Sequence, residues 1–163
     1  MTVLAAHGFA LTVPRGWDAR IRLPVAQSVA APPSMRTEEV VPMGGTTNPI
    51  LHATTMMLPA IVGDYGGGAV ERLGPHDAFV AIVGFDVEAA KTALFTRRGI
   101  PTLREANFRP ATQQRVLAGA SGTQSFFQAA NRPYCLYVVV GRHALRRSVI
   151  PRCNELLRGL RFT

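Results

Sequence analysis

Short stretches of alternating apolar and polar residues recur along the chain, and this period of two is typical of half-buried β-strands. Near the start, Phe9–Val13 reads FALTV and Ala19–Leu23 reads ARIRL. Between them lies the sequence PRGW, in which Pro14 fixes φ and Gly16 permits a positive φ, so a turn is expected there. The pattern predicts that the two stretches pair as a hairpin at the edge of a sheet.

The C-terminal part has the most regular strand pattern. Thr123–Ala130 and Tyr134–Val140 are joined by the turn sequence NRP, which predicts a long antiparallel hairpin. The continuous apolar run 79–85 predicts a central strand that is covered on both faces. Further strands are predicted, in chain order, at 51–58, 91–96, 103–108, 115–117 and 160–162.

One helix is predicted after this hairpin, because apolar residues recur there at helical spacing. The residues that share its apolar face are Val149, Ile150, Cys153, Leu156 and Leu157. Ser148 is expected as the N-cap, which places Pro151 in the first turn, where its missing N–H costs little. A helix that begins near Ala144 is the alternative, and Pro151 would then kink it. Gly159 is expected at the C′ position.

Residues 24–49 form a segment without a strand or helix pattern. Five prolines and a Gly-Gly pair break any regular element in it. Irregular segments of this length are uncommon in compact domains, so we expect either a functional loop or irregular cover for the core. The 163 residues suit one domain, and we expect residues 1–163 to fold as a single unit around this segment.

Three sequence features resemble the PsbP-like superfamily: the opening GFALTVPRGW, the hairpin FFQAANRPYCLYVVV and the apolar helix that runs into LRGLRF. That superfamily also includes a Ran-binding nuclear-transport protein and many bacterial proteins of unknown function. The resemblance covers roughly the first twenty and the last forty residues. It implies an antiparallel sheet sandwiched by helices and no shared catalytic residues. With the strand and helix patterns, it predicts an α+β fold in which helices flank an antiparallel sheet, as an α/β/α sandwich.

Charge is distributed unevenly along the chain, whose formal net charge is +8. Residues 1–96 carry six basic and eight acidic side chains, whereas residues 97–163 carry twelve arginines against Glu105 and Glu155. An excess of this kind favours acidic partners such as nucleic acid, an anionic surface or an acidic protein. Arg142, Arg146 and Arg147 flank the last hairpin and helix, and they are the predicted binding residues. A purely compositional origin is the alternative, because the chain has seventeen arginines and one lysine.

Motifs for catalysis, metals and cofactors are missing from the sequence. The stretch GDYGGGAVERLG at 63–74 lacks the Lys and Ser/Thr of a phosphate-binding loop, so its glycines are interpreted as a turn. Ser121 lies in GASG, which differs from the G-x-S-x-G nucleophile elbow. Cys135 and Cys153 match no zinc spacing and are expected to be buried, reduced thiols. No catalytic residue, metal ligand or cofactor is therefore predicted.

The sequence favours a non-catalytic binding or structural domain, most simply a protein-interaction module in a larger assembly or a homo-oligomer. The alternative is a domain that binds nucleic acid or an anionic surface through its arginine-rich half, and a small hydrolase is a third candidate. The longest apolar runs have about seven residues, far short of the about 20 that a spanning helix needs. No signal peptide is recognised, so a cytoplasmic protein is expected unless an export signal has been removed.

Overall fold

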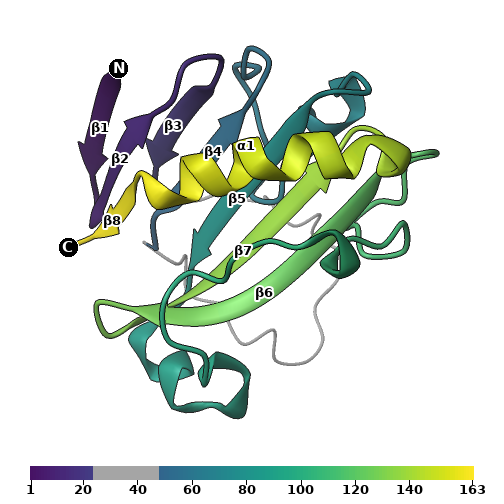
Figure 1. The fold of residues 1–163 in the computed structure, drawn as a ribbon. Helices are drawn as coiled ribbons and strands as arrows, with labels where there is room; N and C mark the ends of the chain where they lie inside the picture. The colour runs from purple at the N-terminus through teal and green to yellow at the C-terminus, as the bar shows by residue number, and fades with distance from the viewer. Residues whose placement is uncertain (24–47) are drawn as a thin grey trace, which may run out of the picture.

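A computed structural model of the chain describes residues 1–23 and 48–163. Of the predicted irregular segment 24–49, all but Asn48 and Pro49 lies outside these residues. The described residues form two antiparallel sheets (Figure 1). The three-stranded sheet has the order β1-β2-β8, with bounds Thr2–Ala6, Phe9–Val13 and Leu160–Phe162. The five-stranded sheet has the order β3-β4-β5-β7-β6, with bounds Asp18–Arg22, Ile50–Thr54, Ala78–Gly84, Arg132–Val140 and Ser121–Ala129.

The stretches Phe9–Val13 and Asp18–Arg22 are strands, but the hairpin predicted between them is wrong. β2 pairs with β1 and β8, whereas β3 pairs with β4, so the chain passes from one sheet to the other at the Pro14–Trp17 turn. Alternating apolar and polar residues indicate that a segment is a strand with one buried face, but they do not determine which strands pair with it. The partner of β2 is instead set by a second turn, at His7–Gly8, where both residues have positive φ (50° and 86°).

The long hairpin β6–β7 is confirmed. Its nine-residue strands pair from Ser121 opposite Val140 to Ala129 opposite Arg132. The connecting turn is Ala130–Asn131, with φ of 48° and 59°, so the strand begins one residue after Asn131. β5 is buried along all seven residues, as expected for a central strand with both faces covered.

The helix α1 spans Arg146–Arg158 and follows a 3₁₀ turn, η5, at His143–Leu145. Ser148 is therefore the third helical residue and not the N-cap, and its hydroxyl donates to the carbonyl of Leu145 at 2.9 Å. Pro151 lies inside the helix, as in the alternative prediction. Gly159 ends the helix with an ordinary φ of −78°, so it is a C-cap and not a left-handed C′ residue. A Cβ at Gly159 would lie 2.6 Å from the carbonyl oxygen of Thr12 on β2.

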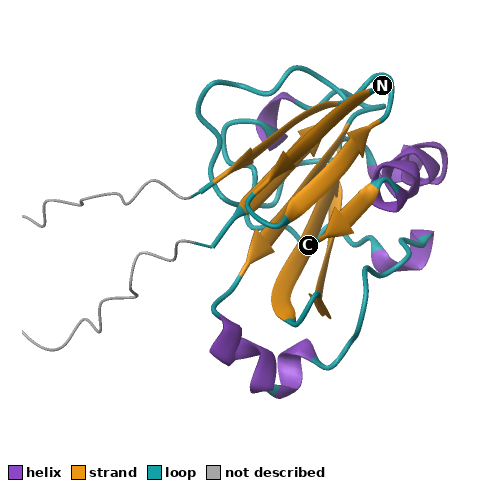
Figure 2. Ribbon diagram, turned by 90° about the vertical axis from the view of Figure 1, so that its left-hand side faces the viewer, coloured by secondary structure: helices purple, strands orange, loops and turns teal. Residues whose placement is uncertain are grey.

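Helices do not cover both faces of the sheet, and the predicted α/β/α sandwich is wrong. The described chain is mainly β, and α1 is its one α-helix, packed on one face. The opposite face is covered by the irregular segment 55–77 and its short 3₁₀ turn η1, Val70–Arg72 (Figure 2). Glycines and two prolines, Pro59 and Pro75, interrupt that segment, so apolar residues such as Leu58 and Val62 pack singly into the core on that face.

Three of the shorter predicted strands are also wrong. The region 87–95 forms the 3₁₀ turns η2, Val87–Lys91, and η3, Ala93–Phe95, and the region near 105 forms η4, Glu105–Asn107. Residues 115–117 form no strand. The apolar residues that suggested strands are single anchors, because Phe95, Leu103 and Phe108 are each buried without a strand around them.

Candidate anion-binding cleft

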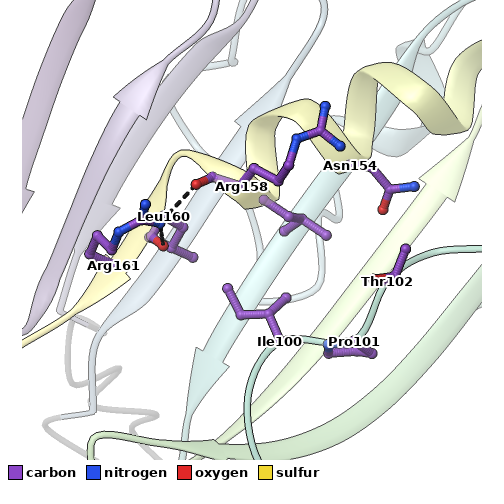
Figure 3. Close-up of a pocket in the computed structure, with 8 residues that line it drawn as sticks. Ile100, Pro101, Thr102, Asn154, Arg158, Leu160 and Arg161 are labelled. Atoms are coloured by element: carbon purple, nitrogen blue, oxygen red, sulfur yellow. Dashed lines mark hydrogen bonds between the residues drawn. The ribbon is translucent and has the colours of Figure 1, made fainter.

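Two hollows lie next to each other on the face of the sheet that carries α1. The first, the polar hollow, has a volume of about 420 Å³ and is lined mainly by Arg97, Arg104, Asn107 and Ser125. The second, the mixed hollow, has a volume of about 300 Å³, and Figure 3 shows its walls. Its walls are the apolar Ile100, Leu157 and Leu160 together with Asn154, Arg158 and Arg161. Pro101 and Thr102 line both hollows, which together we call the arginine cleft.

The cleft exists because the irregular segment 97–107 is fixed at two points. At one point, Gly99 N–H donates to the carbonyl of Gln128 and Gln128 N–H donates to that of Arg97, both at 2.8 Å, which attaches the segment to the edge of β6. At the other, Leu103 N–H donates to Asn154 Oδ1 at 2.9 Å, and Asn154 Nδ2 donates to Leu103 O at 3.0 Å. The segment therefore runs from β6 to α1 and separates the two hollows.

Ser125 places the polar hollow on the helix face. It lies opposite Leu136 on β7, whose side chain belongs to the core beneath α1, and directly opposed residues point to the same face of a sheet. Next to it, Arg104 N–H donates to Asn107 Oδ1 at 3.0 Å, which fixes the short turn η4. Hydroxyl and amide groups thus stand beside arginine side chains in this hollow.

Charge in the arginine cleft has one sign. Arg97 and Arg104 line the polar hollow, Arg158 and Arg161 line the mixed hollow, and among residues 1–23 and 48–163 no carboxylate lines either one. Arg161 Nη1 donates to the carbonyl of Arg158, the last residue of α1, at 2.8 Å and to that of Leu160 at 3.0 Å (Figure 3). The guanidinium groups of the other three form no hydrogen bond or ion pair with the residues that the structure describes. Three donor-rich cations are thus available to an anionic ligand.

The predicted binding residues Arg142, Arg146 and Arg147 lie at the other end of α1. Arg146 donates to the backbone carbonyls of His143 at 2.9 Å and Glu105 at 3.3 Å, so it joins α1 to η4. Arg147 lies 3.8 Å from the Glu105 carboxylate and is largely exposed, which makes it a weak surface pair. Arg142 is exposed at the start of η5. Polyanion binding by these three arginines stays a prediction.

Sequence reasoning missed the four arginines of the cleft. Arg97 and Arg104 come from the irregular segment, whereas Arg158 and Arg161 come from the end of α1 and from β8. No local motif joins them, because tertiary packing through Leu103 and Asn154 brings the two regions together. The only signal in the sequence was the excess of arginine after residue 96.

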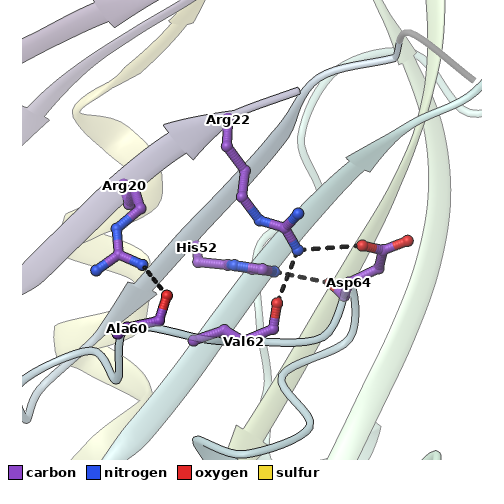
Figure 4. A network of polar contacts seen from close by, with 6 residues as sticks. All are labelled: Arg20, Arg22, His52, Ala60, Val62 and Asp64. Atoms are coloured by element: carbon purple, nitrogen blue, oxygen red, sulfur yellow. Dashed lines mark hydrogen bonds and ion pairs between the residues drawn. The ribbon is translucent and has the colours of Figure 1, made fainter. Parts of the chain in front are cut away.

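A second polar network lies on the opposite face, around the buried His52 of β4 (Figure 4). Its Nε2–H donates to the carbonyl oxygen of Asp64 at 2.8 Å. The pKa of His52 is lowered to about 4: burial is the largest cause, the hydrogen bond to Asp64 opposes it, and the charge of the nearby Arg22 adds to the lowering. Arg22 also donates to Val62 O at 2.8 Å and to the Asp64 carboxylate at 3.1 Å. These contacts attach the loop around Asp64 to the sheet edge, and a neutral imidazole that donates one hydrogen bond suits that structural role.

The glycine-rich stretch forms a tight turn below this network. Gly66 and Gly68 have φ of 90° and 91°, a conformation that favours glycine. A Cβ at Gly66 would lie 2.5 Å from the ring of Phe79. The Gly68 N–H donates to the Glu71 carboxylate at 2.8 Å, so a carboxylate already occupies a donor that a phosphate would need. These contacts agree with the interpretation of the stretch as a turn.

Other candidate groups are placed away from solvent. Ser121 is the first residue of β6 and is fully buried, whereas a nucleophile elbow exposes its serine. Cys135 and Cys153 are both buried free thiols, as predicted. Within residues 1–23 and 48–163, no group of three or more His, Cys, Asp or Glu side chains is arranged to hold a metal ion. In the same residues, no helix is both long enough and apolar enough to cross a bilayer.

Comparison with known proteins adds no relative: no protein-family model, curated protein or solved structure matches the chain. The resemblance to the PsbP-like superfamily therefore stays a prediction. Any function has to be argued from the residues of the chain itself.

Proposed function

We propose that the chain is a non-catalytic binding domain that holds an anionic partner in the arginine cleft. The observation that carries the proposal is the set of guanidinium groups of Arg97, Arg104 and Arg158, which line adjacent hollows where no described residue supplies a carboxylate. Like charges held near one another repel, and a bound anion removes that cost while accepting charge-assisted hydrogen bonds. The hydroxyl and amide groups of Ser125 and Asn107 add neutral donors in the polar hollow.

The cleft suits binding better than chemistry. A general acid or base needs a group that titrates near neutral pH, and the lining residues are arginine, hydroxyl, amide and apolar side chains. The proposal keeps the arginine-rich half as the binding surface but moves the principal residues from the start of α1 to the segment 97–107 and the end of α1. Arg142, Arg146 and Arg147 then extend the positive field beyond the cleft.

The test compares two double variants that lose the same charge. Arg97→Ala with Arg104→Ala removes the polar hollow's cations. Arg72→Ala with Arg115→Ala removes two exposed arginines from the side of the sheet opposite α1, because Arg72 lies in η1 and Arg115 follows Gln114, whose N–H donates to Tyr137 on that face. Labelled polyglutamate is titrated against each protein over a range of salt concentrations.

The cleft variant should bind at least about tenfold more weakly than wild type and show a flatter salt dependence, since each lost contact to a charged group is worth about 1.5–3 kcal/mol. The control variant should bind within about twofold of wild type. Equal losses in the two variants would mean that net charge alone attracts the polymer. Absence of binding by the wild-type protein at low salt would also contradict the proposal.

A further inference from the structure

The two hollows of the arginine cleft differ in polarity, so they favour different chemical groups on a ligand. The polar hollow presents Arg97, Arg104 and Ser125, whereas the mixed hollow presents the apolar side chains of Ile100 and Leu157 beside arginine. An anion without apolar parts would occupy the polar hollow and leave the mixed hollow filled with water. A ligand that carries both kinds of group, joined by a short spacer, uses the whole cleft.

We infer that the partner is an extended acidic segment of a protein that places one apolar side chain in the mixed hollow and its carboxylates in the polar hollow. The inference rests on the proposed function, because it assumes that the arginine cleft is the binding site. Charge complementarity supplies the attraction, and the apolar walls supply the preference for a peptide over a bare polyanion.

One backbone segment separates the two hollows, and an extended peptide can cross it. Pro101 and Thr102 line both hollows, so one backbone segment separates them, and neighbouring extended chains lie about 4.8 Å apart. Side chains on one face of an extended peptide recur about every 6.6 Å, at alternate residues. An apolar residue two to four positions from a run of carboxylates therefore reaches across this backbone segment.

The size of the mixed hollow favours one side chain. A cavity of about 150 Å³ holds benzene, and the mixed hollow has about 300 Å³ and is open to solvent. A leucine or phenylalanine side chain fits this space with room for water. Burying such a side chain changes affinity by about tenfold or more.

Nucleic acid fits the same charge less well. Proteins that bind single strands combine basic grooves with aromatic rings on which the bases stack. Neither hollow has an aromatic residue in its lining. In the same half of the chain, Phe127, Tyr134 and Tyr137 are buried in the two cores, where they are not available to bases.

The experiment uses labelled peptides and the full chain. One peptide carries a leucine next to a run of glutamates, a second has serine in place of leucine, and a single-stranded oligonucleotide of similar charge is the third probe. Wild-type protein should bind the leucine peptide at least about tenfold more tightly than the serine peptide. Ile100→Ser should abolish that difference. Val87→Ser, an exposed apolar position on η2, is the matched control.

The outcomes separate the inference from the proposed function. If both peptides bind equally and both depend on Arg97 and Arg104, the anionic cleft stands and the apolar contact is refuted. If the oligonucleotide binds more tightly than either peptide and depends on the same arginines, the partner is nucleic acid and the inference is wrong. If none of the probes depends on these arginines, both fail.

Ile100 also packs against the core, so its variant needs a second measurement. Arg158→Ala changes an exposed side chain at the rim of the mixed hollow and leaves the core intact. This variant should weaken binding of the leucine peptide by at least about threefold without changing the melting temperature. An unchanged affinity would place the peptide elsewhere and overturn the inference.

Discussion

The burial of His52 predicts that the protein loses stability in mild acid. The side chain is 1% exposed, and burial lowers its pKa from 6.5 to about 4. In the unfolded chain the same imidazole is solvated and titrates near 6.5. Because the folded pKa is the lower one, the unfolded state binds more protons between these two values. The stabilisation is complete above the unfolded pKa and is lost as the pH falls toward the folded pKa.

The two pKa values set the size of the effect. Linkage between them gives a loss of about 2 kcal/mol by pH 5 and about 3 kcal/mol by pH 4, at roughly 1.4 kcal/mol per pKa unit. The variant His52→Gln removes the titrating ring and keeps an amide N–H that can donate to the Asp64 carbonyl. Its stability at neutral pH should be lower than that of wild type, since glutamine fills less of the site.

The assay is urea denaturation of both proteins at a series of pH values from 8 to 4. Subtracting the free energy of unfolding of His52→Gln from that of wild type cancels the contributions that the carboxylates and the other histidines make to the pH dependence. The advantage of wild type over His52→Gln should shrink by about 2 kcal/mol between neutral pH and pH 5. The exposed His76 gives a control. The side chain at position 76 contacts water in both the folded and the unfolded protein, so the free energy of unfolding of His76→Gln should change with pH as that of wild type does. Parallel curves for wild type and His52→Gln would refute the reasoning.

Three further outcomes can be measured by unfolding experiments. Gly66→Ala should destabilise by about 2–4 kcal/mol, from its positive φ and the clash with a phenylalanine ring, whereas Gly67→Ala, which faces open space, should change stability by less than about 0.5 kcal/mol. Reducing agent should leave the melting temperature unchanged, because Cys135 and Cys153 are free thiols. A thiol reagent should modify them only as fast as the protein unfolds, because burial raises their pKa values to about 11 and about 12. ATP with magnesium should not shift the melting temperature, since Glu71 already occupies the N–H of the glycine turn; a dose-dependent rise would contradict that interpretation of the turn.

Local patterns predicted the elements whose pairing is local. The β6–β7 hairpin is continuous in sequence, so its alternation and its turn residues were enough to predict it. β2 was predicted as a strand but with the wrong partner, because its neighbours include β8 at the far end of the chain. The sequence signal for β1 is the two-residue turn His7–Gly8, which joins it to β2.

The expected helices on both faces failed for a different reason. Apolar residues in segments 55–77 and 87–108 are spaced irregularly, and those that are buried, such as Leu58, Phe95 and Leu103, are single anchors with the backbone around them in loops or 3₁₀ turns. Periodicity identifies regular elements and gives no account of irregular cover. The arginine cleft was missed for the same reason, because one of its two walls is a segment of this kind.

The size of the sheet explains why a cleft forms where it does. Five strands about 4.8 Å apart make a sheet roughly 20 Å wide, whereas one α-helix with its side chains covers about 10 Å. α1 therefore leaves part of its face uncovered, and the segment 97–107 fills the side toward β6. An extended segment touches the sheet only where a side chain such as Leu103 points inward, so hollows remain beside each anchor. Arginines at the rim of these hollows keep their charged ends in water, and that solvation makes them available to a partner.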